Sequence, residues 1–173
     1  MIRLCCLKCV NSTIVKSLRT ALILAVLSCI QVSQAQDVPL DIHFSQSLNF
    51  GSLAILDNHS VQFIKFDYLG NISYSKGLRV IERGHIAIAE IISPRKNALL
   101  YITTDIIQPI TEANGATDNH FRLTDIYTKP YVHVAANGPT ILPIGGRLET
   151  SGNGSSNYAD VDYNSRFSIT VNF

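Results

Sequence analysis

The chain has 173 residues, of which 46% are hydrophobic and only 16% are charged. This length fits one domain, and the apolar fraction is too high for an intrinsically disordered chain. The 14 Lys and Arg nearly balance the 13 Asp and Glu, for a net charge of +1. This balance excludes the polybasic field that nucleic-acid or anionic-membrane binding requires.

Residues 1–35 are typical of a secretory signal peptide. They hold four basic residues and no acidic one, and then a largely apolar run at 21–30, which is the order of a basic n-region and a hydrophobic h-region. Small residues at Ser33 and Ala35 predict cleavage after Ala35. A run of this length is too short to anchor the chain across a bilayer. Without the leader, ten basic residues face 13 acidic ones, so the exported domain, 36–173, is mildly acidic.

All the cysteines lie in this leader, at Cys5, Cys6, Cys9 and Cys29. The exported domain therefore depends on its apolar core and not on disulfides. An alternative to cleavage after Ala35 is a lipoprotein box at 26–29, in which Cys29 would be acylated. Leu27 is bulkier than the usual residue at its place in such a box.

The exported chain begins with two strand patterns. Four apolar residues alternate with polar residues or Pro, namely Val38, Leu40, Ile42 and Phe44, which places them on one face of an extended segment. Pro39 has no N–H to donate, so this segment is predicted as an edge strand. Residues 48–53 follow, with Leu48 and Phe50 on one face and Gly51 as a bulge or bend.

Further strands are predicted at 61–66, with Val61, Phe63 and Lys65 on one face, and on either side of a turn at 76–77. Residues 84–92 have a composition that also suits a buried helix. Because Gly and Pro leave only about nine residues between them, their length favours a buried strand.

The second half of the chain continues this pattern. Strands are predicted at 98–104, 121–127, 131–134, 141–148 and 166–173, with a polar separator at 111–120 and turn clusters at 137–139, 145–146 and 151–157. Many short strands without a helical period predict an all-β fold, specifically an Ig-like antiparallel β-sandwich. The predicted core includes Phe50, Leu100, Ile102, Phe121, Leu123, Leu148, Phe167, Ile169 and Val171.

Residues that carry chemistry are scattered. The five histidines stand singly, and the segments 118–120 and 160–162 lack the Gly and distal Glu of a calcium loop. No nucleophile elbow, Walker loop or dinucleotide fingerprint occurs. We therefore expect no enzyme, no catalytic residue, no metal and no cofactor. Three glycosylation-type sequons, at Asn58, Asn71 and Asn153, predict surface turns.

The chain ends in a regular alternation of apolar and polar residues, with Phe167, Ile169, Val171 and Phe173 on one face. An ordinary half-buried final strand has this pattern. So do the C-terminal strand of chaperone–usher pilus subunits, which is bound by strand addition, and the terminal strand of outer-membrane barrels.

Three short motifs carry a family resemblance: residues 48–51, residues 144–148, and the closing run from Tyr163 through Phe173. In these motifs the chain resembles the bacterial domain-of-unknown-function family 4402. The resemblance covers about residues 40–173 and implies an exported β-sandwich similar to fimbrial and adhesin subunits. The chain departs from the family pattern at Val161 and Ser165, where small residues or Gly are expected, and the resemblance brings no catalytic residue.

Together these patterns predict a non-catalytic exported structural or adhesive protein, a pilin-like subunit of the periplasm or cell surface. Its candidate assembly strands are Val38, Leu40, Ile42 and Phe44 as donor, and the last strand as the edge of an acceptor. The donor segment has an alternative role as a first strand of its own domain. We expect protein partners, namely other subunits and a periplasmic chaperone, and no nucleic acid or nucleotide.

Two alternatives belong to other classes. A small outer-membrane β-barrel would make the membrane a partner, and 36–173 is long enough for eight strands. A periplasmic binding module would require a site that the sequence does not display.

The leader makes one testable prediction. N-terminal sequencing of the exported protein should start at Gln36 or its cyclised form, because Ala35 ends the signal peptide. A start at a lipid-bearing Cys29 would contradict cleavage after Ala35.

Overall fold

The computed structural model describes residues 39–113, 119–154 and 158–173, which belong to one compact unit, Val38–Phe173. The leader lies outside the described residues. The strands are β1 (Asp41–Gln46), β2 (Asn49–Ile55), β3 (Phe63–Phe66), β4 (Ile72–Tyr74), β5 (Leu78–His85), β6 (Ala87–Ile92), β7 (Leu99–Ala113), β8 (Arg122–Tyr127), β9 (Tyr131–His133), β10 (Thr140–Glu149) and β11 (Tyr163–Asn172). The described part of the chain forms no helix, and so none that spans a membrane.

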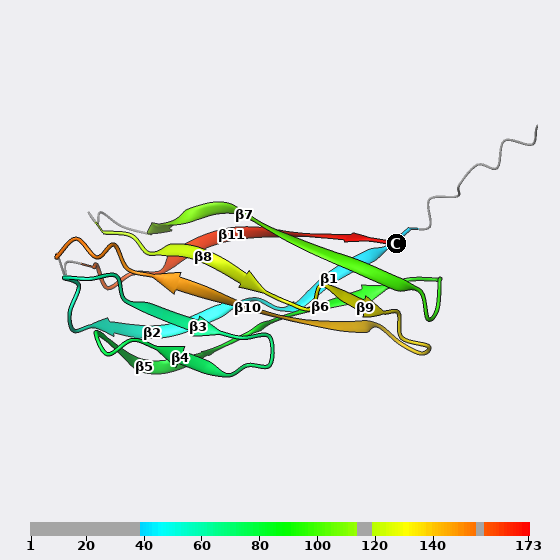
Figure 1. The fold of residues 1–173 in the computed structure, drawn as a ribbon, viewed down its shortest axis with the longest axis horizontal. Helices are drawn as coiled ribbons and strands as arrows, with labels where there is room; N and C mark the ends of the chain where they lie inside the picture. Colours follow the sequence, from blue (N-terminus) through cyan, green and yellow to red (C-terminus); the bar gives the residue numbers. More distant parts are fainter. Residues whose placement is uncertain (1–38, 114–118, 155–157) are drawn as a thin grey trace, which may run out of the picture. The chain divides into compact units, whose positions relative to one another are not determined.

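All strand pairs are antiparallel. The larger sheet has the order β1-β6-β10-β8-β7-β11, and β3, β4 and β9 attach to it beside β10 and β7 (Figure 1). β2 and β5 form a separate two-stranded sheet. The prediction of an all-β, antiparallel sandwich class is confirmed, and an Ig-like strand order stays a prediction.

β10 changes its partners halfway along its length. Its first half, up to Ile144, pairs with β6, and its second half, from Gly145, pairs with β8 on one edge and β3 on the other. A Cβ on Gly145 would overlap the carbonyl oxygen of Phe66 and lie 2.6 Å from that of Asp67. Gly145 therefore permits the close approach of β3, and the turn predicted at 145–146 is wrong because both residues lie within β10.

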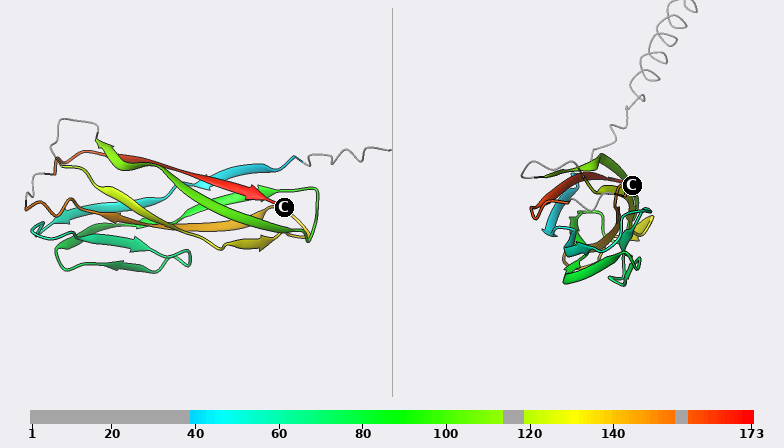
Figure 2. Two further views of the ribbon diagram at one scale, coloured as in Figure 1. Left: turned by 45° about the horizontal axis from the view of Figure 1, so that its top comes forward. Right: turned by 90° about the vertical axis from the view of Figure 1, so that its left-hand side faces the viewer.

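Because β3 pairs with the second half of β10, β5 does not pair with β10. β1 pairs with β6, and β2 pairs with β5, so residues 41–55 and 78–92 form one long bent ribbon. The half of this ribbon formed by β2 and β5 lies apart from β10. Its residues Phe50, Leu53 and Val80 pack against the cluster that contains the buried residues of β3 and β8. Seen end on, the strands of this unit curl around a common interior (Figure 2).

Two strands show how burial follows alternation. In β6 the side chains of Ala87, Ala89 and Ile91 are fully buried, which confirms a buried strand at 84–92 instead of a helix. In β3 the buried residues are Ile64 and Phe66. The face predicted from Val61, Phe63 and Lys65 is therefore the outer face of that strand.

β7 is longer than its pattern predicted. It continues from 98–104 through Pro109 to Ala113, into the predicted polar separator. Between Gln108 and Glu112 its register with β11 shifts, and Pro109, which has no N–H to donate, lies in this irregular stretch.

The core consists of two clusters, one around β6, β7 and β10 and one around β3, β8 and β10. Of the predicted core, the buried residues are Leu100, Ile102, Phe121, Leu123 and Leu148. The half-buried residues are Phe50, Phe167, Ile169 and Val171, which pack against the clusters from β2 and β11. The predicted core is thus confirmed at its centre and incomplete along these two strands.

The Gly145 contact makes a prediction. Gly145→Ala should lower the free energy of unfolding by about 1–3 kcal/mol, because the new methyl group meets rigid backbone of β3. Chemical denaturation measures this loss. Gly138→Asn is the control, since Gly138 has open space around it and a φ of 73° that Asn tolerates. Equal stability of Gly145→Ala and the parent protein would contradict the steric argument.

Candidate functional site

The candidate donor segment lies within its own domain in this structure. Leu40 and Ile42 pack against the first core cluster, and β1 pairs along its length with β6, with Ile42 opposite Ile91. Phe44 is 44% exposed. Val38 lies outside the described residues. The segment therefore has the role of a first strand here, which was the alternative to a free donor.

Three of the four C-terminal candidate residues lie on the inner face of β11, and Phe173 follows the strand. Phe167, Ile169 and Val171 are half-buried and contact the first core cluster. Phe173 is 42% exposed, and the guanidinium carbon of Arg95 lies 4.6 Å from the centre of its ring. The rings of Phe44 and Phe167 meet edge to face, with centroids 6.3 Å apart. The structure thus brings the two predicted assembly segments side by side.

Six strands of the described chain, β1, β2, β4, β5, β9 and β11, pair with a single strand and so leave one edge without a strand partner. Among them, β1 and β11 are the two outer strands in the order of the larger sheet, and β2 has β5 as its partner. β1 and β2 run toward the end of the unit where β11 starts, so they are antiparallel to β11 (Figure 1). One wall of unpaired backbone, β1–β2, therefore faces another, β11.

A groove of about 950 Å³ lies between β2 and the start of β11. Residues 47–55 line one wall, and residues 158–165 and Phe167 line the other. Its floor is largely apolar and is formed by the buried residues Phe121, Leu123 and Leu148 together with the buried Thr111. Farther along, where β1 faces β11, the Phe44–Phe167 contact joins the walls.

β-Bulges set the direction of the side chains in both walls. The register of β2 shifts between Ser52 and Leu53. Phe50 and Leu53 therefore both pack inward, although they are three positions apart and strict alternation would place them on opposite faces. In β11 the register shifts on both sides of Arg166, and Tyr163 and Phe167 both pack against the second core cluster. Each wall therefore presents large apolar side chains to the groove.

The end of the groove near the start of β11 is aromatic. Phe121 lies between Tyr158 and Tyr163, with ring centroids 4.6 Å and 5.0 Å away. The hydroxyl of Tyr158 accepts a hydrogen bond of 2.8 Å from the backbone N–H of Ser151. This bond connects the aromatic end to the loop that follows β10.

Asn58 holds the same loop from inside the protein. Its side-chain oxygen accepts from the N–H of Gly152 at 3.0 Å, and its amide donates to the Ser151 hydroxyl at 3.0 Å. Asn58 is 2% exposed, so the prediction for this sequon is correct for the exposed turn around it, at Asp57 and His59, and wrong for the side chain of Asn58 itself. Asn71 and Asn153 are exposed as predicted.

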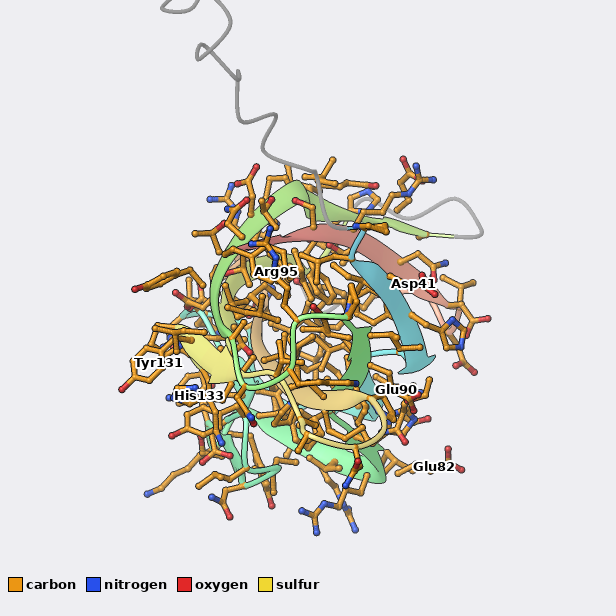
Figure 3. All side chains as sticks on the ribbon, turned by 90° about the vertical axis from the view of Figure 1, so that its right-hand side faces the viewer. Asp41, Glu82, Glu90, Arg95, Tyr131 and His133 are labelled. Carbon is orange, nitrogen blue, oxygen red and sulfur yellow. The ribbon has the colours of Figure 1, made fainter. Side chains whose placement is uncertain are left out.

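The charged residues that line the groove are acidic. Asp160 and Asp162 lie at its aromatic end, are exposed, and are joined in the lining by no Lys, Arg or His from the described residues. Arg166 is exposed and does not belong to the lining. At the opposite end of the unit, Figure 3 shows Asp41 and Glu90 pointing outward beside β1 and β6, away from Tyr131 and His133 of β9.

The described ranges contain no group of three His, Cys, Asp or Glu residues placed to hold a metal ion. His59 pairs with Asp57 at 2.8 Å, and both are exposed. The backbone N–H of His59 donates to Asp57 and lowers the pKa of that carboxyl group. This pair fixes a turn, as an Asx turn does. Asp118 of the 118–120 segment lies outside the described residues.

Comparisons of the chain with models of protein families, with curated proteins and with solved structures find no match. The geometry of the groove is therefore the basis for any functional conclusion. The sequence pattern did not identify β2, Tyr158 or Tyr163 as groove walls. The signal that points to β2 is the break of alternation after Ser52, which marks a bulge.

The partial burial of Phe167 in the groove wall leads to a prediction about the free energy of unfolding. Phe167→Ala should cost about 1–2 kcal/mol, less than the 3–5 kcal/mol typical of a fully buried Phe, because one side of its ring faces the groove. Leu100→Ala is the comparison, since Leu100 is fully buried and should cost about 2–5 kcal/mol. Urea denaturation of both variants measures the difference. A larger loss for Phe167→Ala than for Leu100→Ala would contradict the assignment of Phe167 to a groove wall.

Proposed function

We propose that this protein is an exported, non-catalytic structural subunit that receives an extended strand from a neighbouring protein in the groove between β2 and β11. The observation that carries the proposal is the pair of unpartnered strand edges that face each other across a groove with a largely apolar floor. The signal peptide and the resemblance to fimbrial-type subunits support export and assembly at the cell surface.

Strand addition suits both walls of this groove. An added strand hydrogen-bonds through its backbone to an open edge, and its alternate side chains fill apolar pockets. Residues 47–55 line the groove, which is room for an added strand of about nine residues, or about 30 Å. An unoccupied pair of edges is also an aggregation hazard, so an occupied groove protects the subunit.

The half-buried walls give such binding its driving force. Phe50, Leu53, Tyr163 and Phe167 are each partly exposed in the free chain. Covering apolar surface contributes about 25 cal/mol per Å² removed from water. An added strand therefore completes the burial that the chain's own strands leave unfinished.

A peptide-binding experiment tests this function. A synthetic peptide of about nine residues, with Val or Ile at every second position, should bind the purified exported protein and raise its melting temperature by several degrees, because it binds the folded state alone. A peptide of the same composition with its apolar residues in one block should bind far more weakly. Calorimetric titration measures both affinities.

Leu53→Glu should abolish peptide binding, since an unpaired carboxylate in the apolar groove is strongly disfavoured. Thr170→Glu is the matched control on the exposed face of β11 and should leave binding unchanged. If the alternating and blocked peptides bind alike, or Leu53→Glu binds normally while folded, the groove is not a strand acceptor.

A further inference from the structure

We propose that the occupant of the groove is a strand from a different protein, with apolar residues at alternate positions and a Lys or Arg at the end that lies beside Asp160 and Asp162. This inference rests on the proposed function and specifies its partner. Its basis is the charge of the groove and the state of the chain's own candidate donor.

The groove carries negative charge at one end and no positive charge in its lining. Asp160 and Asp162 immediately precede β11 and are exposed beside the aromatic end of the groove. Neither carboxylate has an ion-pair partner in the described chain. A basic residue on an incoming strand gives these carboxylates a counter-charge, and an acidic residue there is repelled.

The chain's own donor segment has the opposite chemistry. Two of the positions that alternate with its apolar residues are acidic, Asp37 and Asp41, and the other two are Pro39 and His43. In a second copy whose strand enters with its first residues at the start of β11, these carboxylates would approach Asp160 and Asp162. Repulsion between these like charges weakens the binding of a second copy of the chain.

The same segment is also held in its own domain. β1 hydrogen-bonds to β6 over the register from Asp41 to Gln46, and Ile42 packs against the buried core cluster. Donating it would remove these contacts from one copy in order to form them in another. A strand from a different protein carries no such cost.

The topology places the basic residue at one end of the incoming strand. Because β2 and β11 run in opposite directions (Figure 1), an inserted strand is antiparallel to one wall and parallel to the other, whichever way it enters. In both directions, the terminus that carries Lys or Arg lies where β11 starts. The rest of the strand contacts the largely apolar floor, which includes Phe121, Leu123 and Leu148.

Four peptides test the inference on the purified exported protein. Three share one alternating apolar core of about nine residues and end on both sides in Lys, in Gln or in Glu; the fourth has the chain's own sequence 36–46. At low salt the Lys peptide should bind about three- to tenfold more tightly than the Gln peptide, and the Glu peptide should bind most weakly. The 36–46 peptide should bind at least tenfold more weakly than the Lys peptide.

The double variant Asp160→Asn, Asp162→Asn should remove the preference for Lys while the Gln peptide binds as before. Asp105→Asn, on the exposed outer side of β7, is a control that makes the same type of substitution away from the groove, and it should keep the preference. Equal binding of the Lys, Gln and Glu peptides would overturn the charge inference and leave the acceptor function intact. Tightest binding of the 36–46 peptide would make a second copy the partner, and no binding of any peptide would overturn the acceptor function itself.

Discussion

The fold depends on the close approach of β3 to β10 at Gly145. β10 pairs with β6 before this point and with β3 after it, on the same edge. Because Gly145 has no Cβ, the backbones of β10 and β3 can lie this close together. Because β3 occupies the edge of β10, β5 cannot continue along it and turns away with β2 into a second layer. The separate β2–β5 sheet, the second core cluster and the free edge of β2 all follow from this one steric condition.

The groove is the point at which the second layer fails to close on the first. β1 approaches β11 closely enough for Phe44 to contact Phe167, whereas β2 diverges from β11 and leaves room for a strand. The side chains on both walls are therefore half-buried, although their alternation is that of core strands. In this protein, incomplete burial along β2 and β11 is a property of the architecture and not of weakly apolar sequence.

Local patterns predicted the strands well and their partners poorly. Alternation identified β1 and β11, and length decided between strand and helix for β6, because both properties depend on neighbouring residues. The inward face of β2 became clear only with the bulge after Ser52, and Gly145 was mistaken for a turn because composition does not reveal an approaching strand. The walls of the groove, β2 and the start of β11, are far apart in the sequence. Whether a strand edge has a partner cannot be predicted from the pattern of neighbouring residues.

The pairing of distant strands has a consequence for how the chain folds. β11 pairs with β7, and β1 pairs with β6, so both outer strands depend on partners many residues away. Folding that requires such non-local contacts is slow, because loop-closure entropy is lost before the contacts form. While these pairings form, the folding chain exposes apolar strand edges for longer than a helical protein of equal size. The yield of folded protein therefore depends on the folding rate as well as on the final stability.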